Sequence, residues 1–460
     1  YQDYIRTLNN AKAEEMMKTE SFLLFKEKII SYLRNFVKGL QEHAMILEDY
    51  IQNIPFETIV ILIEKAPEVG GRVAQWGSLF STDETGKDMM KRLSSELSKH
   101  QNITLMTNTK VIENKGSVGN ISLKVRTSND TVTELNVGSV LMATGFDFYT
   151  PAEGEFGYAT SDKVITLPEF KQMIDTQSGK LMHKGKEVKN IAYIYCVGSR
   201  QTDGENTYCS RNCCTSTIHA AVTAKQKFTD INNYHFNRGL RTYGKQEILY
   251  ADSLRAGDIY LQSYEDGLPT VTTDGNKTIV KINDILTNGR EIEVEADLVV
   301  LVTGMVPRSD NNTIGSLFKL PKGRDKFFNE VHMKLRPVET VIDGITIAGA
   351  CQGPKNIAES VNSALSAATK SYSILSKGEL ETDPLVATID PEKCTWCGAC
   401  ESACPFDAIL KVEKDGKTIA EINNTVCKGC GMCAPVCDPD AVNLIACSSK
   451  EIMSMIDALV

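Results

Sequence analysis

The sequence lacks any apolar run that approaches the 18 or so residues of a membrane-spanning helix. It also lacks an excess of basic residues, because 50 lysines and arginines face 59 aspartates and glutamates, for a formal net charge of -9. Nucleic-acid binding needs a basic face, so we predict a protein with no membrane span and no nucleic-acid partner. At 460 residues the chain is long enough for two or three domains.

The 14 cysteines do not follow a disulfide pattern. Most stand in C-x-x-C runs or in an adjacent pair, and no signal peptide opens the sequence. This arrangement favours metal binding over disulfides. Since iron–sulfur clusters need reduced thiolates, we expect a reducing cytoplasm, in an anaerobic organism.

Eight cysteines form two similar runs near the C-terminus. Both have C-x-x-C-x-x-C-x-x-x-C spacing, and Pro405 follows the first run whereas Asp438 follows the second. In bacterial ferredoxins the fourth cysteine of each such run binds the other cluster. A zinc site is the alternative, but the doubled pattern favours a ferredoxin domain with two [4Fe–4S] clusters. The expected ligand sets are Cys394, Cys397, Cys400 and Cys437 for one cluster, and Cys427, Cys430, Cys433 and Cys404 for the other.

Buried-strand patterns alternate with amphipathic segments from residue 58 to 375. Such alternation predicts a doubly wound α/β fold with ligands at the carboxyl ends of parallel strands. Helices are expected at 85–100, 214–228 and 357–375, and strands through 232–303. The expected division is a helical segment at 1–57, the α/β region at 58–375 with a second half-domain at about 165–305, a linker at 376–387, an α+β ferredoxin domain at 388–446 and a C-terminal helix at 447–460.

A further group of cysteines follows the predicted strand at 190–196, and we call it the irregular site: Cys196, Cys209, Cys213 and Cys214. Four thiolates within 19 residues suffice for one cluster, and their spacing matches no zinc finger. The alternative is that the adjacent pair consists of small buried residues at the start of a helix. The irregular site occupies the turn where a two-dinucleotide flavoprotein would bind a nicotinamide cofactor.

Several motifs together resemble the A subunit of heterodisulfide reductase. They are Cys196-Val-Gly-Ser-Arg200, Tyr208-Cys-Ser-Arg-Asn-Cys-Cys214, Arg241-Thr-Tyr-Gly-Lys245 and Gly349-Ala-Cys-Gln-Gly-Pro-Lys355. The resemblance covers about residues 58–445. It implies a thioredoxin-reductase-like FAD domain, a [4Fe–4S] cluster at the irregular site and ferredoxin clusters that carry electrons onward, in total FAD and three [4Fe–4S] clusters.

The resemblance also implies partners and a reaction. The partners would be B- and C-type catalytic subunits, a hydrogenase or formate dehydrogenase and a small electron-linker subunit, in a dimer of a larger complex. In the methanogen enzymes the FAD splits electron pairs between two acceptors, which is electron bifurcation. This chain is similar to shorter relatives, because residues 75–80 run directly into a helix where methanogen enzymes carry an inserted ferredoxin domain.

The expected flavin contacts lie at strand ends. Glu64 is the acid expected at the ribose of an adenine dinucleotide, although a solvated strand-end acid is the alternative. By resemblance, His219 and Glu169 lie near the flavin ring, where His219 would tune the flavin, and helix-surface positions are the alternative. The other expected contacts are Lys65, Gly70, Gly71, Arg72, Ala143, Thr144, Gly145, Gly349, Ala350, Gly353 and Pro354.

One part of a flavoprotein sequence is missing. A G-x-G-x-x-G loop should precede Glu64 by about 20 to 30 residues, and the best candidate, residues 34–39, keeps only its last glycine. We therefore keep an alternative function, a flavin-free electron-transfer scaffold that carries only clusters. A reductase that uses a pyridine nucleotide is disfavoured, because cysteines fill the second dinucleotide loop.

Overall fold

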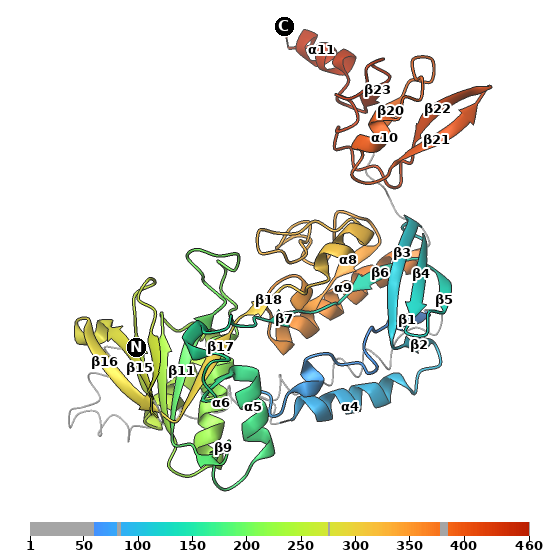
Figure 1. The fold of residues 1–460 in the computed structure, drawn as a ribbon. Coiled ribbons are helices and arrows are strands. Elements are labelled where there is room, and N and C mark those ends of the chain that lie inside the picture. The colour runs from blue at the N-terminus through green and yellow to red at the C-terminus, as the bar shows by residue number, and fades with distance from the viewer. Residues whose placement is uncertain (1–58, 81–83, 275–276, 378–384, 460) are drawn as a thin grey trace, which may run out of the picture. The chain divides into compact units, whose positions relative to one another are not determined.

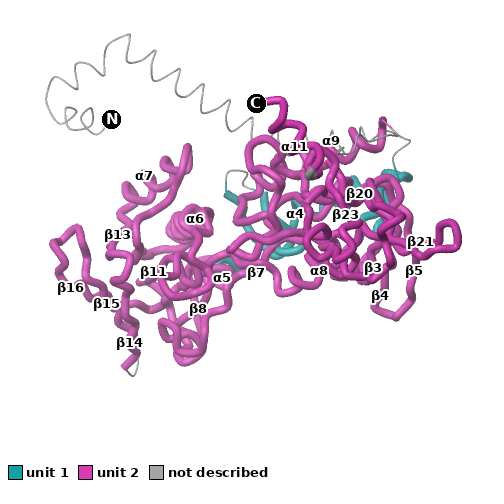
Figure 2. Tube along the Cα trace, turned by 90° about the horizontal axis from the view of Figure 1, so that it is seen from above, with its two compact units in different colours: residues 1–62, 69–105, 171–176 teal, residues 63–68, 106–170, 177–460 magenta. Residues whose placement is uncertain are grey.

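The computed structural model describes residues 59–80, 84–274, 277–377 and 385–459. The helical segment expected at 1–57 and residues 378–384 of the expected linker lie outside this description. The chain divides into two compact units (Figure 2), one of residues 1–62, 69–105 and 171–176 and one of residues 63–68, 106–170 and 177–460. Each unit is described by itself.

The first unit contains most of strand β1 (Val60–Ile63), the short helix η1 (Val73–Gln75), helix α4 (Gly86–Leu97) and most of strand β2 (Ile103–Met106), which pairs with β1. Thr85 caps α4 by accepting a hydrogen bond from the Asp88 amide at 3.0 Å. The side chain of Met89, a residue of this helix, is buried. The helix expected at 85–100 is therefore present and slightly shorter.

The second unit is built around a parallel sheet with the order β13-β12-β11-β17-β8. All six residues of β17 and seven of the eight in β11 are buried, as their continuous apolar sequences predict. Helix α6 packs against β11 and β17 (Figure 1). Helix α5 (Leu167–Thr176) is divided, because residues 171–176 belong to the first unit. The other bounds are β8 Val164–Thr166, β11 Asn190–Val197, α6 Cys213–Lys227, β12 Asn232–Asn237, α7 Glu247–Arg255, β13 Ile259–Gln262 and β17 Leu298–Thr303.

Two antiparallel meanders and several short elements complete this α/β region. Strands β6 and β19 pair in parallel, which places their carboxyl ends side by side. The bounds are β3 Thr109–Ser117, β4 Asn120–Thr127, β5 Val132–Val137, β6 Val140–Met142, β7 Asp147–Phe148, η2 Glu155–Gly157, β9 Met182–His183, β10 Lys186–Glu187, η3 Gly244–Gln246, β14 Thr270–Asp274, β15 Lys277–Asp284, η4 Ile285–Thr287, β16 Arg290–Ala296, β18 Met305–Val306, α8 Asn311–Phe318, β19 Ile345–Ile347, η5 Gly349–Cys351 and α9 Ile357–Lys377.

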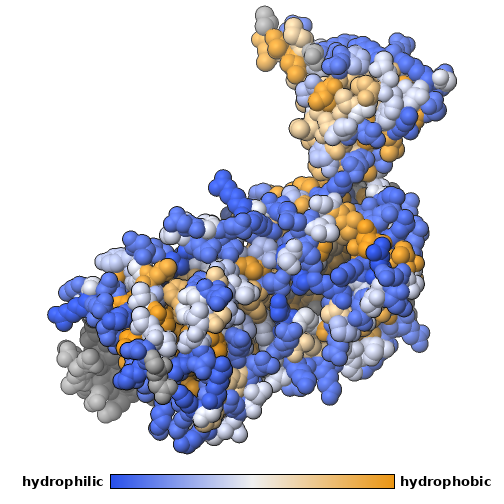
Figure 3. Space-filling model, in the orientation of Figure 1, coloured by the Kyte–Doolittle hydropathy of each residue, from blue (hydrophilic) through white to orange (hydrophobic). Residues whose placement is uncertain are grey.

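The C-terminal part of the same unit is a small α+β module. Its core combines cysteines with apolar residues such as Ile409 and Val442. Helix α11 exposes Ile452, Met453, Met455 and Ile456, and Figure 3 shows apolar surface over this helix. The bounds are β20 Ala387–Ile389, α10 Ala399–Ala403, β21 Ile409–Lys414, β22 Lys417–Ile422, β23 Val442–Leu444 and α11 Ser449–Asp457.

The α/β class and the C-terminal ferredoxin-like module agree with the sequence prediction. The sequence analysis expected strands through 232–303, but α7 lies within that range. The helix is required because β12 and β13 are parallel neighbours, and parallel strands need a crossover connection. Among the residues that the structure describes, no helix combines the length and apolar character of a membrane span.

Candidate electron-transfer site

The cysteines of the irregular site meet at the carboxyl end of the central strand β11. Cys196 lies at the end of the strand with φ +62°, beside a register shift in the pairing of β11 with β17. Cys213 and Cys214 lie in the first turn of α6, and Cys209 lies in the loop between β11 and α6. Unpaired amides at a helix N-terminus favour thiolates there.

The four thiols are close enough to influence one another's ionisation. Burial raises the pKa of Cys196, and the neighbouring Cys214 and Cys209 raise it further. A hydrogen bond between Cys213 and Cys214 raises the pKa of Cys213 and lowers that of Cys214. The Cys209 sulfur accepts a hydrogen bond from the Arg211 amide at 3.3 Å. Four thiols this close together supply the number of ligands that one [4Fe–4S] cluster takes.

Two buried serines hold the loop between β11 and α6. The Ser199 hydroxyl donates to the Tyr208 carbonyl at 3.0 Å, and the Ser210 amide donates to Ser199 Oγ at 3.1 Å. Ser210 Oγ accepts from the Met305 amide at 2.9 Å. The loop is therefore tied both to itself and to the strand end beside β11.

The turn after β11 leaves little room for a nicotinamide dinucleotide. Gly198 has φ +66°, and a Cβ atom there would lie 2.0 Å from the Tyr149 ring. At the neighbouring strand end, a Cβ on Gly304 would lie 2.9 Å from the Gly198 carbonyl and from Ser210 Oγ. An aromatic ring and the serines thus occupy the place where a pyrophosphate would approach the backbone.

Two arginines lie at this site: Arg200, which ends one of the motifs, and Arg238, which the sequence did not single out. Arg200 and Arg238 are buried, with side-chain exposures of 10% and 6%, and both pair with Glu265. Their positive charges lower the pKa of Cys196, against the effect of burial. The Gly-Ser-Arg sequence after Cys196 was visible, but the meeting of the two arginines depends on the pairing of β11 with β12.

The strand ends expected to contact flavin also come together. Parallel pairing of β6 with β19 places Ala143, Thr144 and Gly145 beside Gly349 and Ala350. Gly145 and Gly349 have φ +77° and +72°, and a Cβ on Gly145 would meet nothing within 4 Å. The buried Thr144 hydroxyl has no hydrogen-bond partner within the described chain. Open backbone and an unsatisfied hydroxyl at a parallel-strand edge fit a bound flavin nucleotide.

Two more expected flavin residues follow η5. Gly353 has φ +148° and open space at its Cβ position, and Pro354 is buried. The Pro354 carbonyl accepts a hydrogen bond from Arg211 Nη1 at 3.3 Å. This contact joins the loop of the irregular site to the loop of the candidate flavin edge within one unit.

Of the remaining expected flavin contacts, Glu64 and Lys65 have partners within the chain, and the others lie in the first unit. Glu64 Oε1 accepts from the Ala66 amide at 2.8 Å, and Lys65 pairs with Asp310 at 2.5 Å. Gly70, Gly71 and Arg72 belong to the first compact unit, where the glycines have φ +111° and +49°. Contact of these residues with flavin stays a prediction.

The two residues expected near the flavin ring have different surroundings. His219 is half-buried on α6, the helix that begins with Cys213 and Cys214. Glu169 caps α5, because its carboxylate accepts from both the amide and the hydroxyl of Thr166 at 2.6 Å. The cap accounts for Glu169 without a flavin, whereas His219 shares its helix with the cysteines.

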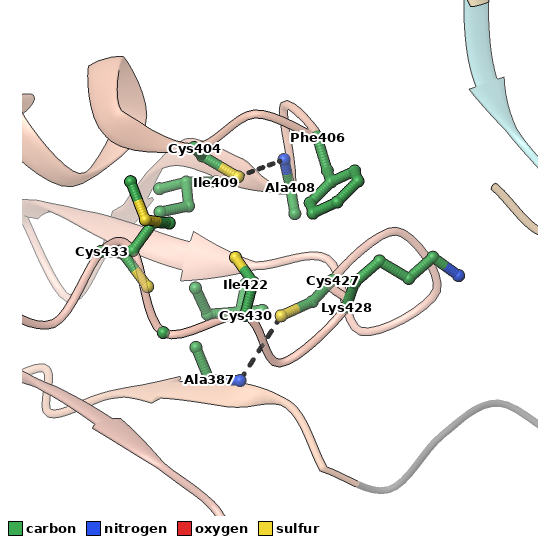
Figure 4. A pocket seen from close by; sticks show the side chains of 12 residues that line it. Ala387, Cys404, Phe406, Ala408, Ile409, Ile422, Cys427, Lys428, Cys430 and Cys433 are labelled. Carbon is green, nitrogen blue, oxygen red and sulfur yellow. Dashed lines mark hydrogen bonds between the residues drawn. The ribbon is translucent and has the colours of Figure 1, made fainter. Parts of the chain in front are cut away.

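The ferredoxin cysteines gather as two groups. Cys404, Cys427, Cys430 and Cys433 line one pocket, where Figure 4 shows their sulfur atoms around a common space. In the other group, Cys397 and Cys437 both raise the pKa of Cys400, after burial. The two ligand sets stay a prediction, and these contacts are compatible with them.

Backbone amides donate hydrogen bonds to several cysteine sulfur atoms in this module. The bonds to Cys394, Cys404, Cys427 and Cys437 measure between 3.2 and 3.4 Å. Such N–H to sulfur bonds stabilise the charge of thiolate-bound clusters. In the described ranges, no group of three or more His, Cys, Asp or Glu side chains converges on a single metal ion.

Comparison with protein families gives two matches. Residues 387–410 match the family described as a 4Fe-4S binding domain, which contains the first C-terminal cysteine run. Residues 1–77 match a family described as a protein of unknown function, DUF2397. The C-terminal module therefore includes a 4Fe–4S binding domain.

Among solved structures, thioredoxin reductase from T. acidophilum is similar over 68% of this chain and 90% of its own, at 16% identity and a TM-score of 0.46. A NAD-dependent persulfide reductase from A. fulgidus is similar over 74% of this chain and 58% of its own, at 16% identity and a TM-score of 0.41. We draw no conclusion from similarity at this level.

Similarity to curated proteins is stronger. The second iron-sulfur A subunit of CoB–CoM heterodisulfide reductase from Methanopyrus kandleri is 32% identical, across 78% of this chain and 67% of that protein. The corresponding A subunit from Methanocaldococcus jannaschii is 30% identical, across 87% and 73%. The A subunit of the H(2)/formate:CoB-CoM heterodisulfide,ferredoxin reductase from Methanococcus maripaludis is 29% identical, across 78% and 67%. The chain belongs to the family of heterodisulfide reductase A subunits, iron–sulfur proteins of electron transfer.

Proposed function

We propose that this chain binds FAD and three [4Fe–4S] clusters and transfers electrons between them and partner subunits. The observation that carries the proposal is the gathering of four cysteines at the carboxyl end of β11, in place of a nicotinamide loop. When bound, FAD exchanges two electrons and each cluster exchanges one, so together they convert electron pairs into single electrons. The family relationship supports the same role.

The residues of this chain would hold these groups and keep water away from them. We assign the strand edge of Thr144, Gly145 and Gly349 to the flavin, on the basis of the open space at Gly145 and the unsatisfied Thr144 hydroxyl. We assign the irregular site to one cluster and the two ferredoxin groups to two more. Burial of Cys196, Cys213 and Cys214 supports the first assignment, because a dry site protects an oxygen-sensitive cluster.

The partners follow from the family and remain part of the proposal. They are B- and C-type catalytic subunits, a hydrogenase or formate dehydrogenase and a small linker subunit, since the relative from Methanococcus maripaludis carries H(2) and formate in its name. The complex would work in the cytoplasm of an anaerobe as a dimer of a larger assembly. Electron bifurcation at the flavin is the reaction that this family suggests.

The test is to purify the protein anaerobically and count flavin and iron per chain. We expect about one FAD and about 12 iron atoms, four for each cluster. Iron near 12 without flavin would overturn the flavin assignment and leave an electron-transfer scaffold. About one FAD with iron near 8 would overturn the cluster at the irregular site.

A further inference from the structure

Two buried arginines stand next to the irregular site. Arg200 follows β11 by three residues, and Arg238 follows β12 by one. Arg200 Nη1 donates to the Arg238 carbonyl at 2.9 Å, so the two residues are held together. Because β11 and β12 are neighbouring parallel strands, both arginines emerge at the edge of the sheet that carries the cysteines.

Both arginines are attached to the loop of the irregular site. Arg238 Nη2 donates to the Ser199 carbonyl at 3.0 Å, three residues after Cys196. The Arg200 amide donates to the Tyr208 carbonyl at 2.8 Å, immediately before Cys209. The guanidinium groups therefore have fixed positions relative to the cysteines.

Their charge is only partly neutralised. Glu265 pairs with both arginines: it accepts from Arg200 Nη2 and lies 3.7 Å from Arg238 Nη1. Two cations and one carboxylate leave one net positive charge. The Glu265 side chain is 60% exposed, whereas the guanidinium groups are 10% and 6% exposed. Water screens the acid more strongly than the arginines, so a positive potential remains inside.

Both arginines are bound to the loop that carries Cys196 and Cys209, so this positive charge lies beside the irregular site. In the ferredoxin module, by contrast, the hydrogen bonds to Cys394, Cys404, Cys427 and Cys437 come from neutral backbone amides. The irregular site thus has a cationic component that these amides do not supply.

We propose that Arg200 and Arg238 raise the reduction potential of the cluster at the irregular site. The inference rests on the proposed function, which places a cluster there. A cluster gains one negative charge when it accepts an electron, and a nearby buried cation stabilises that charge. Because guanidinium stays protonated at all ordinary pH values, this contribution does not vary with pH. Arg200 and Arg238 are positioning residues that act through the electrostatic field.

The experiment is a redox titration of the full-length, anaerobically purified protein, followed by EPR. The signal of the irregular-site cluster is identified as the one that is missing in Cys214→Ser. In Arg238→Met we expect the reduction equilibrium of this signal to become about tenfold less favourable, which corresponds to about 59 mV for one electron. The ferredoxin signals serve as an internal control and should not move. Arg290→Gln, which removes an exposed arginine from β16, should leave every potential unchanged.

A second variant tests the sign of the effect. Glu265→Gln removes the exposed acid while the hydrogen bond from Arg238 to the Glu265 backbone carbonyl can remain. The potential of the irregular-site cluster should then rise, and this result decides the matter if Arg238→Met loses its cluster. Unchanged potentials at 12 iron atoms per chain, or equal shifts of all three clusters, would overturn the inference. Iron near 8 in the unmodified protein would instead overturn the proposed function.

Discussion

The irregular site and the ferredoxin module present cysteines in opposite ways. In the ferredoxin module the thiols come from two short runs. The backbone amides of Ala408 and Ala441, each four residues after a cysteine, donate hydrogen bonds to the sulfur atoms of Cys404 and Cys437. At the irregular site the thiols lie at the end of a buried parallel strand, in a loop and in the first turn of a helix. The ferredoxin thiols therefore depend on the spacing within two short runs, whereas the irregular site depends on the strand pairing of the sheet.

The largest expected effect is loss of a cluster. Cys214→Ser and Cys433→Ser should each remove one third of the iron, about four of about 12 atoms per chain, because each change removes one of four ligands. Iron analysis after anaerobic purification measures this. Cys447→Ser changes an exposed cysteine outside both groups and should keep all the iron. Full iron content in Cys214→Ser would contradict a cluster bound by Cys214 at the irregular site.

The next effect concerns the flavin edge. Gly349 has φ +72°, so a valine there would be strained, and its Cβ would lie 3.7 Å from the Ser360 side chain at the candidate flavin edge. Gly349→Val should reduce flavin content at least tenfold, measured as FAD released per chain. Gly119→Val is the matched control, because Gly119 has φ +84° in the turn between β3 and β4. Similar flavin loss in both variants would indicate general strain rather than a flavin site.

A smaller effect is expected from the buried polar network around Asp258, the residue immediately before β13. Asp258 accepts hydrogen bonds from Lys225 at 2.8 Å and Ser253 at 2.5 Å, and His235 lies 3.7 Å away. Burial alone would raise the pKa of Asp258, but these partners outweigh it and lower the pKa from 3.8 to about 2. Breaking such a buried pair costs about 3 kcal/mol, so Asp258→Asn should lower the free energy of unfolding by about that amount.

Urea unfolding under anaerobic conditions measures this loss. The same carboxylate predicts a pH dependence. Its folded pKa lies below the unfolded value, so its contribution is present above about pH 4 and is lost as the pH falls toward 2. Asp258→Asn should lack this part of the acid sensitivity. The EPR signals of the ferredoxin clusters should persist in the variant, and their loss together with the irregular-site signal would contradict the independence of the two regions.

The smallest effect is expected at His219. Its helix begins with Cys213 and Cys214, and the family resemblance places this residue near the flavin ring. His219→Ala should shift the flavin potential by about 30 mV, which is a tenfold change in a two-electron equilibrium. Spectroelectrochemical titration of the flavin measures it, with Lys227→Ala on the same helix as the control. An unchanged potential would leave His219 as an ordinary helix residue.

Prediction from the sequence was most successful where the signal was local. The continuous apolar residues of β11 and β17, the helix at 357–377 and both ferredoxin cysteine runs were recognisable, because periodicity and spacing are properties of a short segment. Helices α5, α7 and α8 were not predicted. They are short, and α7 in particular is specified by the parallel pairing of β12 with β13 rather than by a strong pattern of its own.

For the sites, the sequence by itself determined which residues can bind iron, since thiolate chemistry and spacing are written in the chain. Only the tertiary structure decided what surrounds them. The hydrogen bond from Arg200 to the Arg238 carbonyl, the Tyr149 ring against Gly198 and the ion pair of Lys225 with Asp258 join residues 38, 49 and 33 positions apart. Such contacts form because strand pairing, parallel between β11 and β12 and antiparallel between β7 and β18, brings distant segments together, and no local pattern records which side chains will meet.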